Sequence, residues 1–282
     1  MIWSGAKSSK PSAWQPTSGR PLRGVKVLDL TRILAGPVGT RFLAGYGADV
    51  LRIDPLVWDE PSVVPEITLG KRCARLDLHN GPDRAVFIRL LSDADILVHG
   101  YRADALERLG FGKKDRRAIN PELIDVSLNA YGHNGPWVLR RGFDSLVQFS
   151  CGIALEGMKW QSAAKPVSLP VQALDHATGY LIAAVAIRGL IARRDQHGSI
   201  SARLSLARTA KLLFDHQGEV NEKPLSAGND ADCAATIEHT DWGPAHRFHP
   251  PAKTGDLAMR WDLPARRLGT SVADWAEFIQ AQ

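Results

Sequence analysis

Cysteine is scarce in this chain of 282 residues, which contains only Cys73, Cys151 and Cys233. The three lie far apart and form no Cys-x-x-Cys pair. An odd, scattered set of cysteines argues against a disulfide framework and is typical of proteins in a reducing compartment. We therefore expect a cytoplasmic location.

Long hydrophobic runs are also missing. The first twenty residues contain no apolar segment of the kind that a secretory signal needs. The longest apolar stretch, 181–192, is interrupted by Arg188 and is too short to span a bilayer. The formal charge of +5, from 35 basic and 30 acidic residues, is small and dispersed. We expect neither a membrane nor a nucleic acid as a partner.

Several motifs of nucleotide-binding and hydrolytic enzymes are absent from the sequence. The first predicted strand is followed by LAGPVG (34–39) rather than by Gly-x-Gly-x-x-Gly. There is no P-loop motif and no Gly-x-Ser-x-Gly nucleophile elbow. His246 and His249 have no cluster of further ligands around them, so we expect no metal site.

What the sequence does contain is a regular alternation of strand-like and helix-like segments between residues 25 and 206. Such alternation predicts an α/β fold, with a Rossmann-like, mostly parallel sheet and helices on both faces. The expected strands are 25–30, 48–53, 73–78, 95–100, 123–128 and 200–206, and the expected helices are 37–46, 81–91, 103–109, 113–119, 143–151 and 176–194.

The ends of the chain differ in composition from this central part. Residues 1–20 are rich in Ser, Pro, Gly and Lys, and the order of segments decays after about residue 210. We expect a flexible lead-in (1–20), a Rossmann-like large domain (21–212), a short linker (213–240) and an extended C-terminal return segment (241–282) with a short helix at 271–280.

Ligands of such folds bind beyond the carboxyl ends of the strands. Three segments directly follow predicted strands: 31–35, 54–55 and 99–104. The carboxyl ends of parallel strands meet at one edge of the sheet. We therefore expect these segments to form the ligand site together.

Asp175 stands where an extended apolar run gives way to a long apolar helix, in PVQALDHATGY (170–180). Aspartate is a preferred helix N-cap residue, and the local sequence favours that role. The same position also suits a nucleophile held at a strand-to-helix corner. The flanking sequence leaves both roles open.

Several segments of the chain, in an order that covers most of 22–206, resemble the family III CoA-transferases of the CaiB–BaiF type. The tail RWDLPARRLG (260–269) is similar to the family's C-terminal return. The matching segments are LRGVKVLDLTRILAGPVGTRFLAGYGADVLRID (22–54), GKRCARLDL (70–78), ADALERLGFG (103–112), NPELIDVSLNAYGHNGP (120–136), RRGFDSLVQ (140–148) and PVQALDHATG (170–179).

The resemblance implies that Asp175 is the catalytic nucleophile, because it stands at the family's catalytic aspartate. In this family the carboxylate attacks an acyl-CoA thioester to give a mixed anhydride, and an aspartyl-CoA thioester follows. A carboxylic acid then accepts the CoA. The CoA thioester is thus a substrate, and no permanently bound cofactor is implied. The small residues Ala173, Ala177 and Gly179 would let a bulky thioester approach.

The phosphates of CoA call for cationic side chains in its site. Positions that match the family's CoA contacts lie mostly after predicted strands or in loops. The resemblance implies that these contacts are Arg32, Ile33, Leu34, Ala35, Lys71, Tyr101, Arg102, Ala105, Arg108 and Arg141.

The chain departs from the family in three places. One of these is Pro55, which follows Asp54 where the family usually has a polar or charged residue. The loop HGYRAD (99–104) stands where the family reads close to ENFRPG. The interval that holds a second, smaller domain in the family is occupied only by about 213–240, without the glycine-rich loop that closes over the aspartate.

Two alternatives therefore stand beside an acyl-CoA:carboxylate CoA-transferase. One is an α-methylacyl-CoA racemase, although a histidine base of that family is replaced by Phe143, which carries no proton. The other is a catalytically incomplete CoA-binding subunit that needs a partner chain. Because family members form interlocked dimers, the resemblance implies a homodimer or a hetero-oligomer with a related chain.

Overall fold

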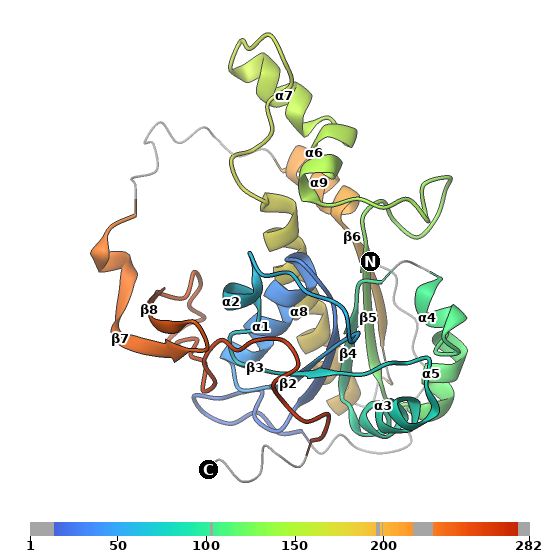
Figure 1. Cartoon of the computed structure of the whole chain (residues 1–282). Coiled ribbons are helices and arrows are strands. Elements are labelled where there is room, and N and C mark those ends of the chain that lie inside the picture. Colours follow the sequence, from blue (N-terminus) through green and yellow to red (C-terminus); the bar gives the residue numbers. More distant parts are fainter. Residues whose placement is uncertain (1–13, 102–103, 196–197, 199, 217–227, 276–282) are drawn as a thin grey trace.

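The computed structural model describes residues 14–101, 104–195, 198, 200–216 and 228–275. Within these residues, six strands form one parallel sheet in the order β3-β2-β1-β4-β5-β6 (Figure 1). This is the strand order of a doubly wound Rossmann sheet, so the expected α/β fold is confirmed. The strands are β1 (Lys26–Leu30), β2 (Asp49–Asp54), β3 (Lys71–Arg75), β4 (Ile96–His99), β5 (Ile124–Asn129) and β6 (Ser201–Ser205).

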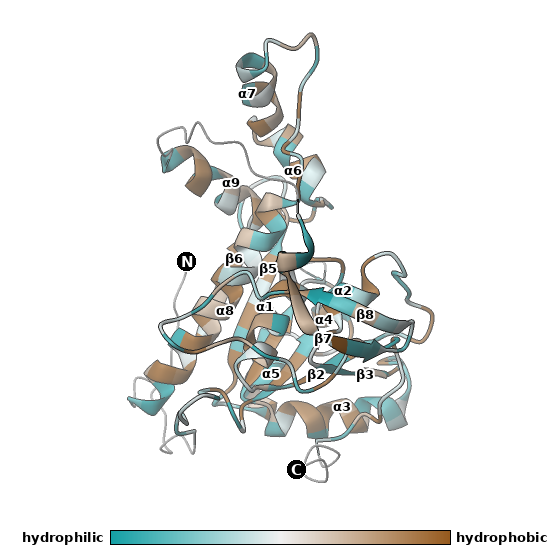
Figure 2. Ribbon diagram, turned by 90° about the vertical axis from the view of Figure 1, so that its left-hand side faces the viewer, coloured by the Kyte–Doolittle hydropathy of each residue, from teal (hydrophilic) through white to brown (hydrophobic). Residues whose placement is uncertain are grey.

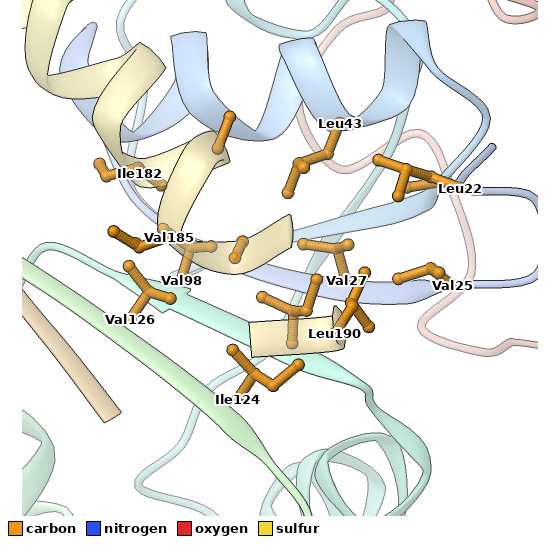
Figure 3. Packing of buried hydrophobic residues seen from close by; sticks show 14 of the residues in the cluster. Leu22, Val25, Val27, Leu43, Val98, Ile124, Val126, Ile182, Val185 and Leu190 are labelled. Carbon is orange, nitrogen blue, oxygen red and sulfur yellow. The ribbon is translucent and has the colours of Figure 1, made fainter. Parts of the chain in front are cut away.

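Two helices, α1 (Ala35–Gly45) and α8 (Ala173–Arg194), cover one face of the sheet. Figure 3 shows their apolar side chains meeting those of the strands. By length and composition, α8 is the one described helix that could cross a bilayer, but in this fold it is a core helix. The labelled side chains at this interface include Leu43, Ile182, Val185 and Leu190 from the helices and Val27, Val98, Ile124 and Val126 from the strands.

The backbones of α1 and α8 touch at Gly39 and Gly179. A Cβ atom added to Gly39 would lie 2.7 Å from the carbonyl oxygen of Gly179. A Cβ atom added to Gly179 would lie 2.8 Å from the carbonyl oxygen of Ala35. Any side chain at either position would therefore push the helices apart. This contact fixes the first turn of α8, which carries Asp175, against the start of α1.

The opposite face of the sheet is covered by α3 (Gly81–Asp93) and α5 (Lys113–Ile119), with α4 (Ala105–Arg108) near the carboxyl edge (Figure 1). The side chain of Asn80 caps α3 by accepting a hydrogen bond from the Asp83 N–H at 2.8 Å. Phe87 and Phe111 meet edge to face in this layer, with ring centroids 4.8 Å apart. Helices on both faces explain why the central strands are buried on both sides, with apolar residues such as Val27, Val98 and Val126 fully covered.

Three further helices lie beyond the carboxyl end of the sheet (Figure 1). The first, α6 (Asp144–Ser150), confirms the helix expected at 143–151. The second and third, α7 (Ile153–Trp160) and α9 (Leu206–Asp215), were not predicted from the sequence. A short helix, α2 (Val64–Ile67), follows β2. The α6–α7 pair forms an arm that stands away from the sheet.

The C-terminal part begins with a 3-10 turn, η1 (Asp230–Asp232), followed by an antiparallel hairpin of β7 (Cys233–Thr240) and β8 (Gly243–Phe248). The sequence predicts no hairpin here. Arg247 ties β8 to the body of the protein through an ion pair with Glu66 at 2.8 Å. The chain then passes beside β3, because the Gly70 N–H donates to the Leu263 carbonyl at 3.0 Å and the Ser271 N–H donates to the Cys73 carbonyl at 2.9 Å.

Other expected boundaries differ from the structure by a few residues. The third strand is 71–75 rather than 73–78, and α8 begins at Ala173 rather than at residue 176. Residues 271–275 are not helical, and the rest of the helix expected at 271–280 lies outside the described residues.

Two of the expected domain boundaries, at residues 212 and 240, fall inside regular elements. The helix α9 crosses residue 212, and the β7–β8 hairpin crosses residue 240. Residues 14–20 of the expected flexible lead-in are attached to the domain, because Arg20 donates a hydrogen bond to the Arg260 carbonyl at 2.7 Å. Residues 1–13 lie outside the described part of the chain.

Candidate functional site

Asp175 occupies the third position of α8, after the N-cap residue Gln172. The Gln172 side chain does not cap the helix, and within the described residues the Asp175 carboxylate accepts no backbone hydrogen bond. Instead, the Asp175 N–H donates to Oδ2 of Asp144 at 2.8 Å. The capping role that the local sequence favours for Asp175 is thus performed by Asp144 of α6. The Asp175 carboxylate itself has no capping role.

The environment of Asp175 disfavours its charged form. Only 5% of the residue is exposed. Burial, reinforced by the nearby Asp144 carboxylate, raises the pKa of Asp175 from its ordinary value of 3.8 to about 7. Asp144 is itself 1% exposed and accepts a hydrogen bond from Nε2 of Gln148. Two carboxyl groups therefore share a nearly dry site in which one of them titrates near neutral pH.

Gln148 connects α6 to the segment that leads into α8. Its Oε1 accepts a hydrogen bond from the Leu169 N–H at 2.8 Å, and its Nε2 donates to the Val171 carbonyl at 3.2 Å. The chain just before Asp175 is therefore held to the same helix as Asp144. Asp144 and Gln148, both on α6, thus fix Asp175 together, one through its backbone N–H and the other through the segment that precedes it. Gly179, which was expected to make room for a thioester, packs instead against α1.

A cleft of about 550 Å³ lies at the carboxyl edge of β1 to β5. Volumes of this size are typical of small-molecule and cofactor sites. Segments after three strands meet in its wall, at the edge where the topology predicts a ligand site. These segments contribute Thr31, Arg32 and Ile33, then Asp54 and Pro55, then Gly100 and Tyr101.

Arg32 is held by aromatic stacking in the wall of this cleft. Its guanidinium carbon lies 4.0 Å from the centroid of the Trp58 ring and 4.7 Å from that of Tyr101. Its buried Nε has no hydrogen-bond partner among the described residues. A stacked and incompletely bonded guanidinium is suited to an anionic or planar ligand group.

The remaining positions of the 31–35 segment have different surroundings. Ile33 lines the cleft and has a positive φ of 64°. Leu34 is the N-cap residue of α1, and Ala35, 5% exposed, begins that helix within the core. Of these three, only Ile33 is part of the wall of the cleft.

Two other expected contacts line the cleft. Ala105 does so from the start of α4, and Arg141 does so from the segment before α6. Next to Arg141, Gly142 and Phe143 also line the cleft, and the following residue, Asp144, holds the backbone of Asp175. Asp175 itself is not part of the described wall. The cleft and the carboxylate are thus connected through residues 142–144.

Lys71 does not belong to this cleft, contrary to expectation. The side chain is fully buried, and its Nζ forms an ion pair with Asp29 at 2.9 Å. The same Nζ donates to Oγ1 of Thr40 at 2.7 Å and to the Pro37 carbonyl at 3.0 Å. All three donor positions of the ammonium group are used inside the core, so no ligand in the cleft can reach it.

Arg108 is not brought to the cleft in the described structure. The Arg108 side chain is 62% exposed and forms an i,i+4 ion pair with Asp104 at 3.2 Å. Arg102 lies outside the described residues.

Sequence reasoning missed Trp58, Glu60 and the role of Asp144. Trp58 and Glu60 lie in an acid- and proline-containing loop after β2, where an aromatic next to two acids is the only signal. In the sequence, Asp144 stands out only as one residue of RRGFDSLVQ (140–148), a segment that resembles the family. No His, Cys, Asp or Glu group of metal-binding size is found in the part of the chain that the structure describes.

Comparisons with known proteins agree with this architecture. Residues 22–249 match CoA-transferase family III. The acetyl-coenzyme A transferase nodX of Hypoxylon pulicicidum is 33% identical over 227 residues, which cover 76% of this chain and 38% of that protein. The succinyl-CoA–L-malate CoA-transferase alpha subunit of Chloroflexus aurantiacus is 30% identical over 206 residues, covering 64% of this chain and 48% of that protein.

A solved structure gives the same result. The crystal structure of Rv3272 from Mycobacterium tuberculosis aligns with a TM-score of 0.63 and 28% sequence identity, covering 71% of this chain and 59% of that one. This chain spans about half the length of the curated relatives it matches, or less. Because the family match extends over most of its residues, the chain belongs to CoA-transferase family III.

Proposed function

We propose that the protein is an acyl-CoA:carboxylate CoA-transferase with Asp175 as its nucleophile. The observation that carries the proposal is that the Asp175 carboxylate, although it sits in the first turn of a helix, does not cap it. It is instead 5% exposed, fixed through its backbone to Asp144, and connected to a cleft of about 550 Å³. A carboxylate that is freed from a structural role, desolvated and fixed in position is suited to covalent catalysis.

The proposed chemistry divides the transfer into two symmetric halves. The anionic Asp175 attacks the thioester carbonyl of the donor, the C–S bond breaks, and CoA leaves as a thiolate. The thiolate then attacks the aspartyl carbonyl of the mixed anhydride, which releases the donor acid and leaves an aspartyl-CoA thioester. The acceptor carboxylate attacks that thioester, and the thiolate released a second time takes the acceptor acyl group. Asp175 is regenerated as a carboxylate.

Backbone N–H groups at the start of α8 support this chemistry. The first turn of a helix has N–H groups without intrahelical acceptors, and these favour negative charge. The Asp175 N–H is taken by Asp144. The proposal therefore assigns stabilisation of the tetrahedral oxyanions to the other free N–H groups of this turn.

The proposed CoA site is the cleft at the carboxyl edge of the sheet. Five of the expected CoA contacts line that cleft and support this site. They are Arg32, Ile33, Tyr101, Ala105 and Arg141. Leu34, Ala35, Arg102 and Arg108 stay in the proposal through the family resemblance alone. Lys71 is removed from it, because its ammonium group is fully engaged in the core. CoA is a substrate in this scheme, and no resident cofactor is proposed.

We further propose that the active form contains a second chain, as a homodimer or with a related partner, and that it acts in the cytoplasm. Large apolar side chains on the α6–α7 arm support a partner, since Leu146, Phe149 and Trp160 are 49%, 52% and 78% exposed. Figure 2 shows hydrophobic residues along this arm. A relative that is called an alpha subunit also favours a catalytically incomplete subunit that a partner completes.

The proposal is tested with a CoA exchange assay on the purified chain, with and without candidate partner chains. An acyl-CoA labelled in its acyl group is incubated with a different, unlabelled carboxylic acid, and both the release of labelled donor acid and the formation of the acceptor's CoA thioester are followed. We expect exchange in at least one assembly and none in the Asp175→Asn variant, which is nearly isosteric. Exchange of an α-proton with deuterated water, without any acceptor acid, would support the racemase alternative instead.

A further inference from the structure

Ile33 has a backbone conformation that its side chain disfavours. Its φ of 64° lies in the left-handed region, which β-branched residues rarely adopt. Ile33 stands in the turn between β1 and α1 and lines the cleft. A strained residue of this kind persists only where the surrounding structure holds it, and such residues are typical of ligand sites.

Glu60 supplies that restraint. Its Oε2 accepts a hydrogen bond from the Ile33 N–H at 2.9 Å. Its Oε1 accepts from Nη2 of Arg52, which is fully buried and bonded to both carboxylate oxygens of Asp54 at 2.7 and 2.9 Å. Because both of its oxygens are used and the residue is 6% exposed, the Glu60 carboxylate is fixed in orientation. It connects the β2 ion-pair network to the 31–34 turn.

The neighbouring loop is fixed in a similar way. Nη1 of Arg75 donates to the carbonyls of Pro55, Leu56 and Trp58, each at 2.8 Å. This loop presents the Trp58 ring on which Arg32 stacks. The loop after β2 therefore holds the turn between β1 and α1 at two points. Glu60 accepts from the backbone N–H of Ile33, and the Trp58 ring stacks on the Arg32 side chain.

We propose that Glu60 is a positioning residue for CoA binding. By holding Ile33 in the left-handed conformation, it directs Arg32 and the backbone of the 31–34 turn into the cleft. Glu60 does not line the cleft, so it acts through Ile33. The inference rests on the proposed function, because it takes the ligand of the cleft to be CoA.

The test is a cycle of variants in which the dissociation constant of free CoA is measured by titration calorimetry. The four proteins are the wild type, Glu60→Ala, Ile33→Gly and the double variant. With Ile33 present, Glu60→Ala is expected to weaken CoA binding about tenfold, as residue 33 relaxes to a negative φ. With glycine at position 33, the same change is expected to alter binding less than about threefold, because glycine adopts a positive φ without steric cost.

Ile33→Pro gives a second route that leaves Glu60 intact. Proline fixes φ near −65° and removes the N–H that Glu60 accepts, so it is expected to weaken CoA binding about tenfold relative to Ile33→Gly. This pair decides the matter if Glu60→Ala does not fold. Equal CoA affinities of the proline and glycine variants, or equal losses from Glu60→Ala in both backgrounds, would overturn the proposal.

A crystal structure of Glu60→Ala separates positioning from the identity of the ligand. We expect residue 33 to leave the left-handed region in this variant, whether or not CoA is the ligand. A retained positive φ would overturn the role of Glu60. If φ changes but the wild type binds no CoA in any assembly, the positioning role stands and the proposed function fails.

Discussion

The backbone N–H of Asp175 donates to Oδ2 of Asp144, 31 residues earlier in the chain, at 2.8 Å. This bond attaches the first turn of α8 to α6. It performs the capping that the Asp175 side chain would otherwise provide. The same geometry places one buried carboxyl group near another, and the pKa of Asp175 rises to about 7 by burial and by this like charge. Asp144 therefore holds the backbone of Asp175 and also adds to the rise of its pKa that burial causes.

The first prediction concerns the pH dependence of transfer. Attack on a thioester needs the anionic form of Asp175, and its pKa is raised to about 7. The single-turnover rate of acylation is therefore expected to rise with pH with unit slope and to level off above this pKa. Rapid-quench measurements with an acyl-CoA across this range provide the test. A rate that is already constant at mildly acid pH would contradict the assignment.

A second prediction concerns stability. The pKa of Asp175 is higher in the folded state than the unfolded value of 3.8, so the folded state binds more protons between the two values. Asp175 therefore costs stability as pH rises from about 4 to about 7, by up to about 4 kcal/mol. Asp175→Asn removes this cost. Urea unfolding is expected to find the variant more stable than the wild type at pH 8 and to find a smaller difference near pH 4.

Asp144 can be tested with two substitutions that separate its charge from its hydrogen bond. Asp144→Asn retains an oxygen that accepts from the Asp175 N–H but removes the like charge. Its pH–rate midpoint is expected to move toward the ordinary value of Asp175. Asp144→Ala also removes the hydrogen bond that caps α8. Its free energy of unfolding is expected to be ~1 kcal/mol lower than that of Asp144→Asn. Unchanged midpoints in both variants would show that Asp144 does not act on the charge of Asp175.

Lys71 and Arg108 provide a contrast between a core cation and a surface cation. Lys71→Met leaves the Asp29 carboxylate without its ion-pair partner in the core and is expected to cost about 3–5 kcal/mol of unfolding free energy. Arg108→Ala breaks an exposed pair with Asp104 and is expected to change it by less than about 0.5 kcal/mol. Denaturant titrations measure both. Equal losses of unfolding free energy would contradict the contrast between a buried Lys71 and an exposed Arg108.

The sheet could be predicted from the sequence because each central strand is a short apolar run of its own. VKVLDL and LIDVSL show their strand character locally, and alternation with helices dictates the parallel order. The hairpin of β7 and β8 was missed because its strands are largely exposed and carry few apolar residues. Without a buried face, the period of two that marks a strand is weak.

The site was harder to predict because its contacts are distant in sequence. Nothing near Asp175 reveals that Asp144 caps its helix, so the local pattern favoured the wrong role. Lys71 looked like a cation before a strand, but its Nζ meets Asp29, which is 42 residues earlier. Glu60 likewise acts on Ile33 through a fold contact between two loops. The sequence shows which residues are charged or polar, but it does not show which of them contact one another in the fold.

The most direct test of the central claim is to trap the acylated aspartate. The protein, in each assembly it forms, is incubated with an acyl-CoA and hydroxylamine, and its peptides are analysed by mass spectrometry. We predict a hydroxamate at Asp175 in the wild type, formed only when acyl-CoA is present, and none in Asp175→Asn. A hydroxamate at another carboxyl group, or CoA exchange at the wild-type rate in Asp175→Asn, would contradict the account.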